Sequence, residues 1–288
     1  MITWPQDLVD VIARRKSVIF IGSGVSRNST NTDGRRPATW EGFLRAAAAG
    51  IQNNENILAR IDVKDYLTAC EIIKRKMGAD AFSRAIQDEY QRPGYIAAKI
   101  HETIYALDSS IVASPNFDVI YDTYARRISE GTIIVKSHRD PDILNFISGG
   151  ESRLLLKVHG TADNPNHVIF TRQEYAKART DHRVFYEIIK ALSLTHRFFF
   201  IGCGYDDPDI RLMFEDVFFA HSIMPEHYMT LPSNEVDGDI SSILFESMKI
   251  RVITYSPEEN HQELTDSLED LVNQVDKRRE DLTVNQKW

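Results

Sequence analysis

Two glycine loops follow strand-like runs and could bind a phosphate-containing ligand. The first comes directly after the apolar run 17–21 and contains Gly22, Ser23, Gly24 and Ser26. Glycines let a backbone approach a pyrophosphate closely, and N–H groups of the turn can donate to its oxygens. The dehydrogenase fingerprint would need a third glycine where Arg27 stands, and no Gly-Lys-Ser/Thr follows for a P-loop. A tight glycine turn without a ligand is the alternative interpretation.

The second glycine loop contains Gly202 and Gly204, after the aromatic run 198–201. Such a loop could close over the adenosine half of a dinucleotide. Alternatively, the Asp207-Pro208 pair that follows simply starts a helix, with proline in its first turn. Cys203 lies between the two glycines, but the acidic residues that follow oppose formation of a thiolate nucleophile.

Two further strand ends carry polar side chains. Asn116 and Asp118 stand two residues apart after the run 111–113, where an amide and a carboxylate could hold a carboxamide and a water or ribose hydroxyl. An ordinary turn with Asp118 near a helix N-terminus is the alternative. His159 ends the apolar run 153–158, and a histidine at that position can act as a general base, although most histidines are structural.

The elements that must position these loops alternate between short apolar runs and helical spacing. We expect strands at 17–21, 111–113, 132–135, 153–158, 168–170, 198–201, 228–231 and 250–254. This pattern predicts an α/β fold: a Rossmann-like, mostly parallel sheet with helices on both faces and ligands at the carboxyl ends of the strands. Thr171 and Glu174 have the spacing of a capping box, which predicts a helix start.

Apolar residues recur at helical spacing between the first two strands. We therefore expect one catalytic domain over residues 1–288 that contains a helical insertion at 40–107. The 288 residues carry 34 Lys and Arg against 42 Asp and Glu, a net charge of −8, which argues against a nucleic-acid footprint. No run is long enough to cross a membrane, no leader is evident, and two cysteines cannot form a disulfide framework, so we expect a cytoplasmic protein.

The order of the four loops resembles the sirtuin catalytic domain. Sirtuins carry a G-A-G-x-S loop, a T-x-N-x-D loop and a catalytic H-G pair, which Gly22 to Ser26, Asn116 with Asp118, and His159 match in turn. Ser114 replaces the threonine. The segment from Pro37 to Trp40 and the late I-G-x-G-Y-x-D-P-D segment are similar to divergent prokaryotic sirtuin-like proteins of anti-phage defence.

The resemblance implies NAD⁺ as substrate. On this hypothesis Asp118 binds the nicotinamide carboxamide, Asn116 positions water or a ribose hydroxyl, and His159 is the general base. The first glycine loop would hold the pyrophosphate, and Gly202 and Gly204 would lie against the dinucleotide. Sirtuin deacylases also carry a zinc ribbon of two cysteine pairs, which Cys70 and Cys203 cannot supply, so we expect no metal.

Loss of the zinc module makes an acyl-lysine substrate doubtful, so the resemblance implies NAD⁺ hydrolysis to nicotinamide and ADP-ribose, depleting the cofactor in abortive infection. The alternatives are an NAD-dependent protein-lysine deacylase and a non-catalytic NAD or ADP-ribose sensor. The resemblance further implies a HerA-like ATPase as partner, with a short Argonaute as the alternative. We also expect homo-oligomers, with no direct nucleic-acid or membrane binding.

Overall fold

A computed structural model describes residues 1–147, 152–205, 214–215, 217–220 and 224–287. In this part of the chain seven strands form one sheet, in the order β3-β4-β2-β1-β5-β6-β7, and every neighbouring pair is parallel. The strands are β1 (Ser17–Ile21), β2 (Ile111–Ser114), β3 (Ile134–Ser137), β4 (Leu154–Lys157), β5 (Arg197–Ile201), β6 (His227–Pro232) and β7 (Ile250–Tyr255). The predicted α/β class and parallel sheet are confirmed.

Helices connect the strands. Their bounds are α1 (Gln6–Ala13), α2 (Ser23–Ser26), α3 (Trp40–Ala49), α4 (Glu55–Asp62), α5 (Tyr66–Met77), α6 (Ala79–Tyr90), α7 (Lys99–Ala106), α8 (Ile120–Ile128), α9 (Leu144–Ile147), α10 (Arg172–Asp181), α11 (Arg183–Thr195), α13 (Gly238–Met248) and α14 (Glu258–Val284). A short 3-10 turn spans Pro165–His167. The helix start expected at Asp207-Pro208 lies outside the described residues.

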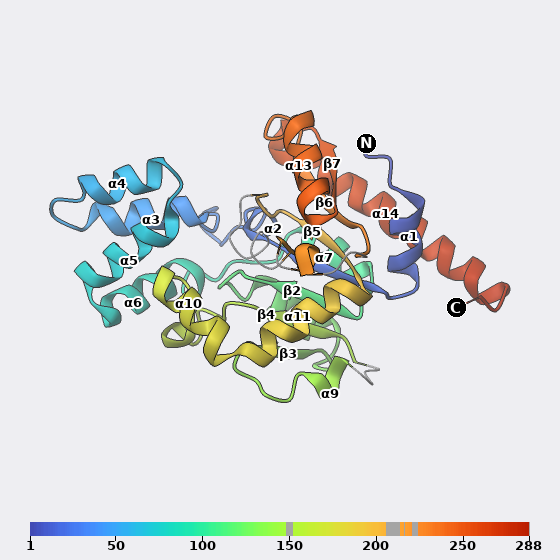
Figure 1. Cartoon of the computed structure of the whole chain (residues 1–288), viewed down its shortest axis with the longest axis horizontal. Coiled ribbons are helices and arrows are strands. Elements are labelled where there is room, and N and C mark those ends of the chain that lie inside the picture. Colours follow the sequence, from blue (N-terminus) through green and yellow to red (C-terminus); the bar gives the residue numbers. More distant parts are fainter. Residues whose placement is uncertain (148–151, 206–213, 216, 221–223, 288) are drawn as a thin grey trace.

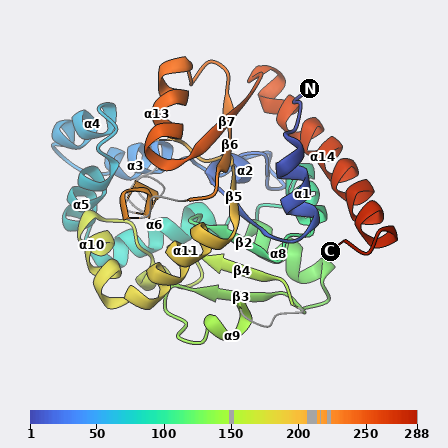
Figure 2. The same ribbon diagram turned by 45° about the vertical axis from the view of Figure 1, so that its right-hand side comes forward.

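Helices cover both faces of the sheet. Successive residues of a strand point to opposite faces, so each strand contributes side chains to the helices on either side. Ile19 and Ile21 of β1 pack in one apolar cluster with α1, α7, α8 and α14. Val18 and Phe20 of the same strand pack in a second cluster with α11 and α13. Figure 2 shows the strand order, from β3 beside α9 to β7 beside α13. All five residues of β1 are buried, so it is the centre of the core.

Helices α3 to α6, which we call the helical module, share a third apolar cluster that also includes Phe117, Ala162, Val168 and Phe170. Figure 1 shows this module at the opposite end of the molecule from the C-terminal part of α14. The predicted insertion 40–107 contains helices and no strand of the sheet, but its last helix differs from the others. Ile100 and Ile104 of α7 join the cluster on the sheet, and α7 packs against α14.

Two expectations about local structure need correction. Residues 168–170 were expected to form a strand, but they pair with no strand of the described sheet. Their apolar side chains are buried because Val168 and Phe170 pack into the helical module, not because they belong to the sheet. The first glycine loop is a single helical turn, α2. The predicted capping box is confirmed, since Glu174 N donates to Thr171 Oγ1 and Thr171 N donates to Glu174 Oε2.

Candidate functional site

The carboxyl ends of β1, β2, β4 and β5 bring the four predicted loops together. A cavity of about 100 Å³ lies there and includes residues from every one of these loops. Its lining contains all but one of the predicted site residues: Gly22, Ser23, Ser26, Asn116, Asp118, His159, Gly202 and Gly204. Gly24 instead lines the larger cleft beside it. Parallel pairing explains this convergence, because it places the ends of neighbouring strands on one edge of the sheet.

Ser26 links the two polar residues of the β2 loop. Its hydroxyl donates to Asp118 Oδ2 at 2.7 Å and accepts a hydrogen bond from Asn116 Nδ2 at 3.0 Å. Asp118 is 5% exposed, and its other carboxylate oxygen accepts from the Ile120 backbone N–H at 3.1 Å. Each carboxylate oxygen has two lone pairs, so Asp118 retains the capacity to accept from a ligand amide.

His159 follows β4 and is 3% exposed. The Tyr175 hydroxyl lies 3.4 Å from His159 Nδ1, and the two rings meet edge to face at 4.9 Å. Tyr175 belongs to α10, and α5 of the helical module contacts the start of α10 through an ion pair between Lys74 and Glu174. The helical module therefore supports the helix that contacts the predicted general base.

The glycines hold the β1 and β5 loops in direct backbone contact. Gly22 N donates to Ile201 O and Gly24 N donates to Gly202 O, both at 2.9 Å. A Cβ on Gly22 would lie 2.3 Å from Gly202 O, and Gly202 has a φ of +66°. Glycine is thus required here for close approach and a left-handed backbone. Because these two amides already have protein acceptors, the predicted pyrophosphate contacts would fall on other donors of the loop.

Burial shapes the electrostatics around Asp118. Desolvation raises the pKa of Tyr90 well above its ordinary value, and the nearby carboxylates of Glu89 and Asp118 raise it further. Desolvation lowers the pKa of His101 to about 4, although Asp118 opposes this shift. At neutral pH both side chains are therefore uncharged and place no charge of their own beside the Asp118 carboxylate.

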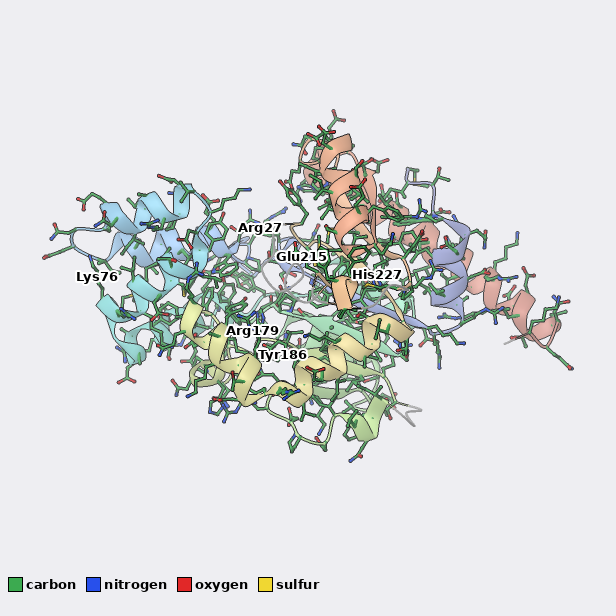
Figure 3. All side chains as sticks on the ribbon, in the orientation of Figure 1. Arg27, Lys76, Arg179, Tyr186, Glu215 and His227 are labelled. Carbon is green, nitrogen blue, oxygen red and sulfur yellow. The ribbon has the colours of Figure 1, made fainter. Side chains whose placement is uncertain are left out.

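A larger cleft of about 640 Å³ adjoins the cavity. The two share five residues: Ser23, Trp40, Gly202, Cys203 and Gly204. The cleft carries four basic side chains and three acidic ones: Arg27, Arg36, Lys64 and Arg172 against Glu41, Asp65 and Glu235. Figure 3 labels Arg27, which lies between the helical module and α13 in that view. The arrangement suits an elongated ligand with one ring in the cavity and an anionic remainder in the cleft.

Aromatic residues that the sequence did not single out close the cavity. Phe170 meets Phe117 edge to face, with ring centroids 4.7 Å apart, and lies tilted against Trp40 with ring centroids 5.6 Å apart. Tyr175 and the buried Lys157 were also missed. A charged residue at the end of the otherwise apolar run 154–157 could have drawn attention to Lys157 in the sequence. No sequence pattern connected Phe170 or Tyr175 to the site.

Both cysteines are buried as free thiols, Cys70 in the helical module and Cys203 in the β5 loop. Within the described residues no group of three or more His, Cys, Asp or Glu side chains could hold a metal ion. No helix in the same part of the chain is both long and apolar enough to span a membrane.

Comparison with known proteins connects this geometry to one family. Residues 111–253 match the model of the SIR2-like domain. "Defense-associated sirtuin 2" of Bacillus subtilis is 26% identical over 210 residues, which are 69% of this chain and 19% of that protein. "NAD(+) hydrolase ThsA" of Enterococcus faecium is 20% identical over 213 residues, 72% of this chain and 41% of that protein.

The protein of the same name from Cytobacillus dafuensis is 20% identical over 253 residues, 81% of this chain and 46% of that protein. The chain thus spans less than half the length of each of these relatives. The match to the family model begins at β2 and ends within β7, so it contains Asn116, Asp118 and His159. The part of the chain from β2 to β7 is therefore similar to the SIR2-like domain, and the chain has distant relatives named for defence and for NAD⁺ hydrolysis.

Proposed function

We propose that this protein hydrolyses NAD⁺ at the bond between nicotinamide and ribose. The observation that carries the proposal is the meeting of Asn116, Asp118 and His159 in one cavity beside a larger cleft with charged side chains. The names of the two ThsA relatives support the same reaction. Nicotinamide would occupy the cavity, and the ADP-ribose portion would extend into the cleft.

Each residue has a role that its contacts support. Asp118 accepts from the carboxamide N–H of nicotinamide, which twists the ring away from the ribose plane. Asn116, held by Ser26, orients a water molecule toward the anomeric carbon. The water attacks that carbon, the glycosidic electron pair leaves with nicotinamide, and His159 accepts the proton of the water. The products are nicotinamide, ADP-ribose and one proton, so atoms and charge balance.

Incubation of the purified chain with NAD⁺, followed by chromatography of nicotinamide, tests the proposal. We expect His159→Ala and Asn116→Ala each to reduce turnover by about 10²- to 10⁴-fold, the range typical for loss of a positioned acid–base group. His167→Ala is the matched control, because that histidine is exposed nearby in the 3-10 turn. Full activity of either site variant, with an unchanged melting temperature, would refute the assignment.

Addition of an acylated peptide to the same incubation separates the competing functions. Acyl transfer from the peptide to ADP-ribose would indicate a deacylase. Stoichiometric NAD⁺ binding without nicotinamide release would indicate a sensor.

We further propose that NAD⁺ depletion serves anti-phage defence, as the name of the Bacillus subtilis relative suggests. The NAD⁺-hydrolysing activity would then be controlled by a partner and by the formation of homo-oligomers. A HerA-like ATPase is the first candidate for the partner, and a short Argonaute is the second. Size measurement of the chain, alone and with each candidate, tests this proposal. A persistent monomer that ignores both partners would refute it.

A further inference from the structure

Lys157 is a lysine buried in the middle of the protein. It is the last residue of β4, two positions before His159, and it is 2% exposed. The three residues before it in the strand are buried leucines. Removing an ammonium group from water costs several kcal/mol unless the group is paired and hydrogen-bonded. The contacts of the Lys157 side chain therefore show how its buried charge is compensated.

The Lys157 ammonium makes two short contacts. Nζ donates to the backbone carbonyl of Asp118 at 2.7 Å and to Asp122 Oδ2 at 3.0 Å. Asp122 is 6% exposed in α8, so both ions of this pair are buried. Burial raises the pKa of Asp122, and Lys157 opposes the rise. The ammonium thus joins three elements: β4, the loop after β2, and α8.

These contacts fix the residue that the proposed reaction uses to hold nicotinamide. The Asp118 carboxylate is held by Ser26 and by the Ile120 N–H, whereas the Asp118 carbonyl is held by Lys157. The side chain and the main chain of Asp118 are consequently anchored to different elements. Since Lys157 and His159 belong to the same strand end, the lysine also sets where Asp118 lies relative to the general base.

We propose that Lys157 is a positioning residue, whose ammonium holds the Asp118 main chain in register with His159 for catalysis. The proposal rests on the proposed hydrolase function. If the Lys157–Asp122 ion pair had only a structural role, a different result would be expected. Replacing both of its members by apolar groups of similar size is often neutral or stabilising, so activity would survive that exchange.

The test compares Lys157→Met/Asp122→Leu with the unmodified protein. Removing both charges avoids leaving one buried ion unpaired. We expect a folded protein whose kcat is reduced by about 10- to 100-fold, the equivalent of one hydrogen bond from a charged group. KM for NAD⁺ should change by less than roughly threefold, because most of the binding surface lies in the larger cleft.

A second pair provides the control. Lys136 of β3 and Asp142 form an ion pair at 2.8 Å on the neighbouring strand, away from the residues that line the cavity. Lys136→Met/Asp142→Leu should retain the unmodified kcat. A further variant, Lys157→Gln/Asp122→Asn, keeps a neutral donor for the Asp118 carbonyl, leaves no unpaired buried charge and should retain more kcat than Lys157→Met/Asp122→Leu. If Lys157→Met/Asp122→Leu does not fold, this variant is compared with the unmodified protein and should still show a lower kcat.

Hydrogen exchange of the ligand-free proteins provides a readout that does not depend on activity. We expect the backbone amides of residues 116–120 to exchange faster in Lys157→Met/Asp122→Leu than in the unmodified protein and in the control. Unchanged exchange, or an unchanged kcat in the folded double variant, would overturn the role of Lys157. If the unmodified protein releases no nicotinamide, either alone or with each candidate partner, the proposed function fails, and the exchange result still decides whether Lys157 holds this loop.

Discussion

Replacing Ser26 by alanine would break the link between Asn116 and Asp118. The Ser26 hydroxyl is 2.7 Å from Asp118 Oδ2 and 3.0 Å from Asn116 Nδ2, and Ser26 itself is 4% exposed. Alanine has nearly the same size but neither donates nor accepts. The substitution therefore removes one buried and one partly buried hydrogen bond without opening a cavity larger than one oxygen atom.

The size of the effect follows from the partners. A hydrogen bond to a charged group is worth about 1.5–3 kcal/mol, and one between neutral groups about 1 kcal/mol. If the Asp118 bond acts mainly by orienting the carboxylate in the transition state, Ser26→Ala should lower kcat/KM for NAD⁺ by about 10- to 100-fold.

Nicotinamide release, measured at several NAD⁺ concentrations, gives kcat/KM for each variant. Ser29→Ala is the matched control, because Ser29 lies three residues further on, is fully buried, and its hydroxyl has no hydrogen-bond partner among the described residues. That variant should stay within roughly twofold of the unmodified kcat/KM. Equal kcat/KM values for Ser26→Ala and Ser29→Ala would refute the view that Ser26 organises the site.

Three further predictions concern stability and the general base. Gly22→Ala should lower the free energy of unfolding by about 1–3 kcal/mol or more, because its Cβ would lie 2.3 Å from Gly202 O; an unchanged urea midpoint would contradict this. Tyr175→Phe removes the hydroxyl beside His159 and should reduce kcat by about 2- to 10-fold and shift the pH–rate profile. Superimposable pH–rate profiles of the variant and the unmodified protein would show that this hydroxyl does not act on His159. Burial lowers the pKa of His227 to about 3 in the folded protein. As the pH drops below 6.5, this histidine therefore binds a proton in the unfolded chain but not in the folded one. The free energy of unfolding should fall by up to about 1.4 kcal/mol per pH unit. Urea unfolding between pH 7 and pH 4.5 measures this slope, and an identical slope in His227→Leu would contradict the assignment.

The sequence was sufficient to predict the parallel sheet and the loops that line the site. Runs such as 17–21 and 198–201 are short, apolar and followed by glycine, a combination typical of buried strands that end at a ligand site. The convergence of the β1, β2, β4 and β5 loops then follows from strand order.

Other features depended on contacts between distant segments. Val168 and Phe170 are buried against the helical module, and single-sequence periodicity cannot distinguish that burial from a strand. Likewise, the amides of Gly22 and Gly24 are occupied by carbonyls of the β5 loop, a partner far away in the sequence. The partners of Lys157 could not be predicted either, because an isolated lysine in a strand gives no indication of where its charge is neutralised.

The central position of β1 has a consequence for biosynthesis. Val18 pairs with Ile111 on one side and with Phe198 on the other, about 180 residues later in the chain. At typical translation rates of 5–20 residues per second, roughly 10 to 40 s separate synthesis of these two strands. The Gly22 to Gly202 contact, and with it the cavity, can form only after the β5 loop has left the ribosome. A nascent or truncated chain that ends before β5 therefore cannot assemble the site.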